Sequence, residues 1–135
     1  MITLFQMNNK KVKELQEKTE KTIYRFEERD WSKEWVGCYD MVAIIETNDL
    51  DKAYEASNLR NEGVSGISTY TEKFCNDQGE KIRGHSMSIN DICFSSDEVA
   101  FYRVAGIGFE KLNDREIKQT LINRMIEQQH YKGRV

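Results

Sequence analysis

The chain has no proline, only two histidines and three cysteines, and no long apolar run. It lacks the ~20 consecutive apolar residues that a membrane-spanning helix requires, and this excludes a membrane protein. Cys38, Cys75 and Cys93 are widely spaced and include no CxxC pair, which favours reduced, partly buried thiols over disulfides. Because cysteine and histidine form no close pairs, we expect neither a metal site nor a cofactor.

The net charge indicates no particular class of partner, and the first residues do not have the pattern of a secretory signal. The formal net charge of −3 does not suggest general phosphate binding, and it is too mild for a protein that imitates DNA. The first lysines follow the apolar segment 2–7 instead of preceding it, which is the wrong order for a secretory signal. We therefore expect a cytoplasmic protein that forms one domain over residues 1–135.

The apolar patterns predict an α+β fold with a small mixed or antiparallel sheet of about five strands. Residues 39–47 contain the strongest strand, whose nearly continuous apolar run at 41–45 is typical of a central strand covered on both faces. Glycines 106 and 108 mark a bulge before Phe109, and they lack the third glycine of a nucleotide-binding loop. The predicted strand segments are residues 2–7, 23–26, 39–47, 67–74, 92–94 and 99–104.

Two to three helices are expected to pack with this sheet. A charged helix at about 8–21, capped by Asn8 or Asn9, has a thin apolar stripe and would lie on the surface. A second helix follows residues 39–47 and is capped by Thr47 or Asn48. A C-terminal amphipathic helix at about 113–130 begins with Asn113 in a capping-box arrangement and docks on the sheet. Its apolar stripe consists of Ile117, Leu121, Ile122, Met125 and Ile126.

The polar stretch 83–94 has the pattern most typical of a functional site. His85 beside Ser86 permits a catalytic interpretation, in which the imidazole is a general base and Asp91 or Asp40 orients it. A ligand or partner contact is a second interpretation. The favoured one is structural, with the polar side chains satisfying backbone groups at a turn. The motif residues are Arg83, Gly84, His85, Ser86, Ser88 and Asp91.

Aromatic and basic residues suggest two kinds of partner. Trp31 and Trp35, four residues apart, would lie on one side of a helical turn, either packed in the core or exposed to a partner. The irregular region 58–82 adds three candidate partner contacts, Tyr70, Glu72 and Asp77. Candidate nucleic-acid contacts are Lys10, Lys11, Lys13, Arg124 and Lys132.

Four segments of the chain resemble, in order, the YodL-like domain of Gram-positive bacteria and their conjugative elements and prophages. The most specific is RGHSMSINDI at 83–92, which is similar to the family signature G-H-S-L-S-[VI]-x-D-[VI] with Met87 in place of leucine. The segment 59–82 is longer than the usual connection, and Ala105-Gly106 replaces a more polar pair. The other matching segments are YRF at 24–26, YDMV at 39–42 and residues 102–109.

The resemblance implies a non-catalytic accessory module of a mobile genetic element. It suggests that the chain acts in the bacterial cytoplasm by binding a host or defence-system protein. Inhibition of a defence nuclease by steric blocking, of the anti-CRISPR or anti-restriction type, is the favoured function. A nucleic-acid-binding accessory protein and a small hydrolase using His85 are the alternatives.

Overall fold

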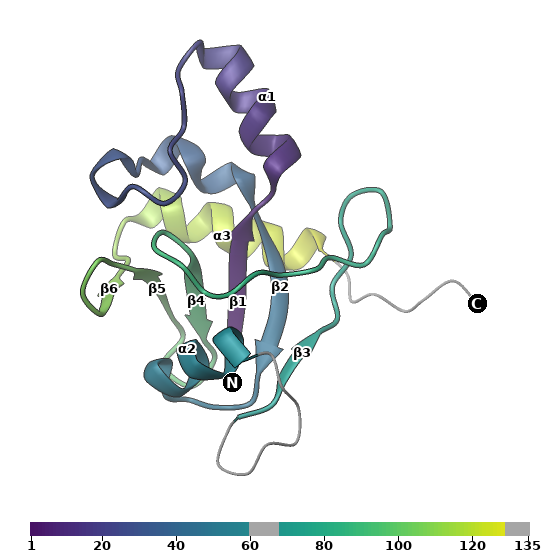
Figure 1. Ribbon diagram of the computed structural model, residues 1–135, viewed down its shortest axis with the longest axis vertical. Coiled ribbons are helices and arrows are strands. Elements are labelled where there is room, and N and C mark those ends of the chain that lie inside the picture. The colour runs from purple at the N-terminus through teal and green to yellow at the C-terminus, as the bar shows by residue number, and fades with distance from the viewer. Residues whose placement is uncertain (60–67, 129–135) are drawn as a thin grey trace.

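In the computed structural model, which describes residues 1–59 and 68–128, six strands form one antiparallel sheet in the order β3-β2-β1-β4-β5-β6 (Figure 1). The predicted α+β class is confirmed. The strands are β1 (Ile2–Met7), β2 (Tyr39–Ile45), β3 (Tyr70–Glu72), β4 (Ile92–Ser95), β5 (Ala100–Val104) and β6 (Phe109–Lys111).

Three α-helices flank the sheet, and they match the three expected helices: the N-terminal one, the one that follows the strand at 39–47, and the C-terminal one. They are α1 (Asn9–Thr19), α2 (Leu50–Leu59) and α3 (Arg115–Glu127), with two short 3-10 helices at Glu28–Asp30 and Lys33–Cys38. Figure 1 shows α1 extending beyond the sheet and α3 lying behind it. Within the two described ranges, no helix has the length and apolar character needed to cross a membrane.

Apolar side chains form one core on each face of the sheet. Behind it, Phe5 of β1 and Tyr39 of β2 pack with Ile117 and Leu121 of α3. On the front face, Leu4 of β1 packs in the same cluster as the buried alanines of α2 and as Met87. Burial on both faces explains the long apolar run of β2, as predicted for a central strand.

A segment without regular helix or strand, residues 81–91, crosses in front of β2 and β1 (Figure 1). We call it the strap. Met87 is its buried apolar anchor, with 2% of its surface exposed, and the Met87 amide donates to Ser57 Oγ of α2 at 2.9 Å. The strap therefore covers the front core and leads the chain into β4.

The predicted strand at 23–26 is wrong. Ile23 N donates to Gln16 Oε1 of α1 at 2.9 Å, and the carbonyls of Arg25 and Glu27 accept from the Asn90 side-chain amide at 2.9 and 3.1 Å. Side chains thus take the place of a neighbouring strand as hydrogen-bond partners. Residues 20–27 form a loop instead, which we call the aromatic loop because it carries Tyr24 and Phe26.

The predicted bulge at glycines 106 and 108 is also wrong. Ala105 N donates to Gly108 O at 3.0 Å, which closes a tight turn between β5 and the unpredicted strand β6. Gly108 has φ +70°, a conformation that glycine adopts at little cost. The predicted strand at 67–74 is shorter than expected, since only Tyr70–Glu72 pairs with β2, and residue 67 lies outside the described residues.

The N-cap residue was predicted correctly for α1, but for α2 and α3 it lies one residue after the predicted position. Asn8 caps α1 as expected, but Asp114 rather than Asn113 caps α3, accepting from Ile117 N at 3.0 Å. Asp49, rather than Thr47 or Asn48, accepts from the first amides of α2. The α3 stripe is narrower than predicted, because Ile122 and Ile126 are 40% and 71% exposed.

Candidate functional site

Gln6 connects the sheet to the strap. It is 3% exposed and follows Leu4 on the front face of β1. Its Oε1 accepts from His85 N at 3.1 Å, and its Nε2 donates to His85 O at 2.8 Å and to Asp91 Oδ2 at 2.9 Å. One side-chain amide therefore fixes two points of the strap that lie 79 and 85 residues away along the chain.

The polar residues of the strap bond mainly to backbone groups of the strap itself. Ser88 N donates to Asp91 Oδ2 at 2.9 Å, and Ser88 Oγ donates to Ser86 O at 3.0 Å. His85 Nδ1 lies 2.8 Å from Ser86 O and 3.3 Å from Gln6 Nε2, so the ring contacts both the strap and the sheet. These bonds match the structural interpretation of the motif.

Asp91, the last residue of the strap, has a buried carboxyl group, with 3% of the residue surface exposed. Burial raises its pKa from 3.8 to about 7, although the Ser88 amide, the Gln6 side chain and the Arg25 charge act in the opposite direction. The site therefore contains a group that changes charge near neutral pH.

Gly84 permits the closest approach between the strap and the sheet. A Cβ at this position would lie 2.6 Å from both the Tyr70 hydroxyl and Cγ1 of Val42. Gly84 N and the Tyr70 hydroxyl both donate to Glu72 Oε2, at 2.5 and 2.9 Å. Tyr70 and Glu72, predicted as partner contacts, are therefore engaged in attaching the strap, and Tyr70 is only 4% exposed.

The two tryptophans do not form an exposed patch. Trp35 is 6% exposed and belongs to the core behind the sheet. Trp31 is partly buried, donates from Nε1 to the Tyr39 hydroxyl at 2.9 Å, and has the Arg103 guanidinium 5.4 Å from its ring. Core packing thus accounts for Trp35, where the predicted partner contact is wrong, and partner contact at Trp31 stays a prediction.

Asp77 and two of the predicted nucleic-acid contacts belong to one ion-pair cluster. Arg124 contacts Asp40 and Asp77 at 2.6 and 3.0 Å, while Lys11 contacts them at 2.9 and 3.5 Å. Lys11 and Arg124 are therefore neutralised within the protein. Lys10 and Lys13 remain exposed on α1, and Lys132 lies outside the described residues.

Asn90 positions the aromatic loop. It is 1% exposed, has φ +74°, and donates to the loop carbonyls of Arg25 and Glu27. Its Oδ1 accepts from Arg103 Nη1 at 2.9 Å, and Arg103 also pairs with Glu28 at 3.2 Å. Neither Asn90 nor Arg103 was a predicted site residue. A signal for Arg103 was present in the sequence, because it is a charged residue within the otherwise apolar strand predicted at 99–104.

Two aromatic rings of this loop face solvent. Tyr24 is 58% exposed and Phe26 is 52% exposed. The Phe26 ring packs edge-on against His85 at a centroid distance of 6.0 Å, and the Arg25 guanidinium lies 5.3 Å from the same ring. The strap and the aromatic loop thus form one continuous surface on the front of the molecule.

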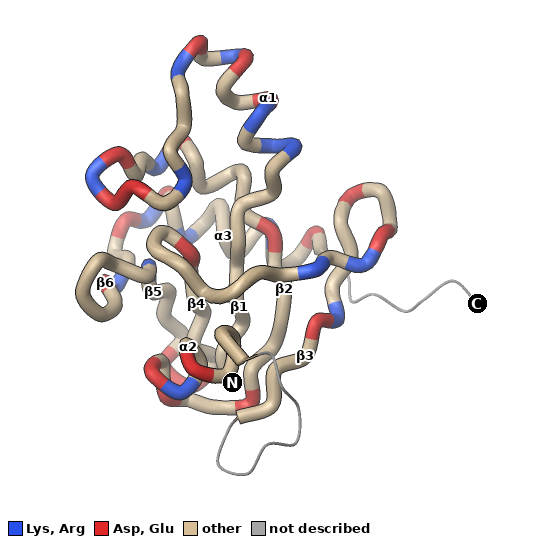
Figure 2. Tube along the Cα trace, viewed as in Figure 1, with Lys and Arg blue, Asp and Glu red and all other residues tan. Residues whose placement is uncertain are grey.

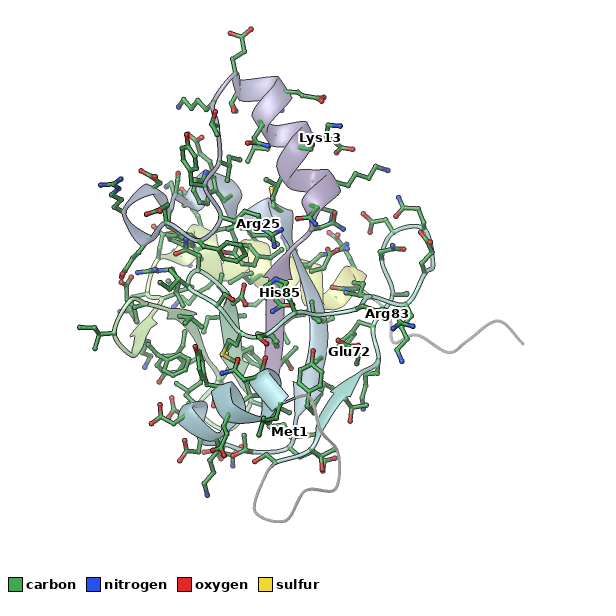
Figure 3. The ribbon with its side chains drawn as sticks, in the orientation of Figure 1. Met1, Lys13, Arg25, Glu72, Arg83 and His85 are labelled. Atoms are coloured by element: carbon green, nitrogen blue, oxygen red, sulfur yellow. The ribbon has the colours of Figure 1, made fainter. Side chains whose placement is uncertain are left out.

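A pocket of about 270 Å³ opens beside this surface, between the end of β1, the start of α1 and the strap. Figure 3 shows Arg25 and His85 close together in front of the sheet, with Arg83 at the outer end of the strap. Among the residues that the structure describes, no group of three potential ligands could hold a metal ion, and the three cysteines are free thiols.

Comparisons with protein-family models, with curated proteins and with solved structures find no match to this chain. The geometry and chemistry of the front surface therefore carry the functional argument.

Proposed function

We propose that this protein is a non-catalytic binding module that inhibits another protein by covering its working surface. The observation that carries the proposal is the exposed aromatic pair of Tyr24 and Phe26 on a loop anchored by buried hydrogen bonds. Aromatic residues and arginine are enriched among the residues that dominate protein–protein binding. The aromatic loop presents both kinds at adjacent positions.

The anchoring of the loop favours binding. The Asn90 amide fixes the loop from inside, and the Arg25 guanidinium donates to Met7 O at 2.9 Å. A surface that is already ordered loses less conformational freedom when a partner docks, so more of the contact energy appears as affinity. Phe26, supported by His85, is the central anchor of the proposed interface.

The similarity to YodL-like domains suggests the context of this interface. Such modules occur on conjugative elements and prophages, which must escape the defences of their bacterial host. We therefore propose a host defence nuclease, such as a restriction enzyme or a CRISPR effector, as the target. Its inhibition would be steric and would require no reaction at His85.

The geometry of His85 supports binding more than hydrolysis. Its Nδ1 lies 2.8 Å from Ser86 O, and its ring supports Phe26. Ser86, the sequence neighbour of His85, is thus contacted by the imidazole through its backbone carbonyl oxygen, and this contact does not activate a hydroxyl nucleophile. The motif accordingly supports the surface on which the aromatic loop rests.

Affinity capture followed by an inhibition assay tests the proposal. The tagged chain is exposed to host lysates with and without defence nucleases, and the captured nuclease is then assayed with the purified chain. Tyr24→Ala/Phe26→Ala should weaken capture and inhibition by at least about tenfold, because both anchors are lost. Tyr54→Ala is the matched control, since Tyr54 is 40% exposed on α2.

Two results would count against the proposal. Equal inhibition by the double variant and the Tyr54 control would remove the aromatic loop from the interface. Turnover of a small substrate that is lost in His85→Ala, with no nuclease captured by the wild-type chain, would favour a hydrolase.

A further inference from the structure

The pocket beside the strap concentrates positive charge in a protein whose net charge is negative. Its lining includes Arg25 from the aromatic loop and Lys81 and Arg83 from the strap. In Figure 2, Lys and Arg positions occur both on the first turns of α1 and on the strap where it crosses β2. The formal net charge of −3 therefore conceals a local basic site.

The three cations are available to a ligand. No carboxylate in residues 1–59 and 68–128 lies within 4.0 Å of the charged nitrogens of Arg25, Lys81 or Arg83. The lining contains one carboxylate, Asp40, but Lys11 and Arg124 already contact it at 2.9 and 2.6 Å. The pocket thus has an uncompensated positive charge.

Arg25 is held in position within this site. Its two terminal nitrogens donate to Asn9 Oδ1 and Met7 O, while its Nε is buried and has no hydrogen-bond partner among the described residues. The guanidinium is therefore oriented before any ligand arrives.

The start of α1 adds to the positive electrostatic potential of the pocket. Asn8 and Asn9 line the pocket, and the positive end of the helix dipole lies at these residues. The first turn of α1 has no acidic residue to balance it and instead contains Lys10 and Lys11. Asn8 Oδ1 already accepts from the amides of Lys10 and Lys11, so the helix end attracts an anion through its positive potential and not through these two amides.

The chemistry of the lining favours phosphate over other anions. Two arginines and one lysine supply several charge-assisted donors, which suits a multiply charged group with oxygens on all sides. The volume of about 270 Å³ is close to the lower limit for small-molecule sites, and the mouth is open to solvent. A single phosphate with a small attached group fits this description.

We propose that the pocket formed by Arg25, Lys81, Arg83 and the first turn of α1 binds a phosphate group. The inference is independent of the proposed inhibitor function, because it concerns a ligand of this pocket and requires no partner protein. The phosphate has two possible sources, a free small phosphomonoester or the backbone of a nucleic-acid strand.

Titration followed by NMR of the backbone amides tests the site. The full chain is titrated with inorganic phosphate, with a ribose 5-phosphate phosphomonoester and with a short single-stranded oligonucleotide, at constant ionic strength set with chloride. Saturable shifts should centre on the amides of Asn9, Arg25, Lys81 and His85. Lys81→Gln/Arg83→Gln should raise the dissociation constant about tenfold, because two charge-assisted contacts are lost.

The matched control is Lys52→Gln/Lys111→Gln, which removes the same charge from exposed positions on α2 and β6. Lys81 and Arg83 are themselves exposed, so both double variants should fold, and their amide spectra verify this. Arg25→Lys provides a third variant that keeps the charge but loses the fixed guanidinium geometry; it should also weaken binding.

Each outcome of the titration either supports or overturns the proposed phosphate site. Saturable binding of inorganic phosphate or the phosphomonoester, weakened in Lys81→Gln/Arg83→Gln and unchanged in the control, supports a small-ligand site. Binding of the oligonucleotide alone at the same amides assigns the phosphate to a nucleic-acid backbone. Shifts that do not saturate, that lie elsewhere, or that weaken equally in both double variants overturn the proposal.

Discussion

Replacing Asp91 by asparagine measures the free-energy cost of burying a carboxylate at the end of the strap. Asp91 Oδ2 accepts from Gln6 Nε2 and from Ser88 N, both at 2.9 Å. An asparagine carbonyl oxygen can accept the same two hydrogen bonds without carrying a charge. The variant therefore retains the local geometry and removes only the ionisation.

The sign of the effect follows from the raised pKa of Asp91 in the folded protein. Below pH about 4 the carboxyl is neutral in both the folded and the unfolded chain, and its full stabilising contribution is present. Between pH 3.8 and about 7 the unfolded chain releases the proton while the folded chain keeps it. The free energy of unfolding therefore falls as the pH rises through this window.

The size of the effect follows from the same pKa difference. A difference of roughly three pKa units corresponds to about 4 kcal/mol when the pH lies well above both values. Between pH 5 and pH 8 the expected loss is about 3 kcal/mol, since part of the change occurs below pH 5. Asp91→Asn lacks this loss because its side chain does not titrate.

Denaturant unfolding of both proteins at several pH values between 5 and 8 provides the assay. The difference in unfolding free energy, variant minus wild type, should rise with pH by about 3 kcal/mol. Asp97→Asn, at an exposed position in the turn after β4, controls for the loss of a surface charge. A difference that stays constant across this range, or that falls with pH, would refute the reasoning.

Three further substitutions, together with one control substitution, test the attachment of the strap and one strained turn. Gln6→Leu should lower the free energy of unfolding by about 3 kcal/mol at neutral pH, because it leaves the backbone of His85 and the carboxyl group of Asp91 without their hydrogen-bond partner. A loss below about 1 kcal/mol would contradict this prediction. Gly84→Ala should cost about 1–3 kcal/mol in denaturant unfolding, because its Cβ would overlap its neighbours. Gly37→Ala is the control: no atom lies within 4 Å of the added Cβ, so the free energy of unfolding should hardly change. Equal destabilisation by the two alanine substitutions would contradict the predicted overlap at Gly84. Val99 has φ +53° and is 77% exposed, and asparagine adopts this left-handed backbone conformation more readily than valine. Val99→Asn should therefore raise the free energy of unfolding by about 1 kcal/mol and raise the midpoint of a thermal melt. A lower midpoint would argue against backbone strain at Val99.

Local patterns were sufficient for most of the secondary structure. The apolar runs predicted β1, β2, β4 and β5, and the spacing of Ile117 and Leu121 predicted α3. These features depend on neighbours within one strand or a few helical turns, so a short window of sequence contains the relevant information. The loop at 20–27 was missed because its hydrogen-bond partner, Asn90, lies 63 and 65 residues away along the chain.

Site prediction failed where burial decided the role of a side chain. Trp35 and Tyr70 have the residue types of a binding surface, but packing behind the sheet and against the strap removes them from solvent. Asp77, Lys11 and Arg124 are likewise engaged in ion pairs with one another or with Asp40. Residue type alone does not specify which charges are neutralised within the fold.

The sequence by itself determined the class of the fold and the positions of its main strands and helices, because hydrophobic periodicity is a local property. Only the tertiary structure decided the roles of polar and aromatic side chains. It brings Gln6 to His85 and Asp91 across 79 and 85 residues, and it leaves Tyr24 and Phe26 exposed beside Arg25. These roles depend on which distant groups share one buried space, and that is set by the packing of the whole chain.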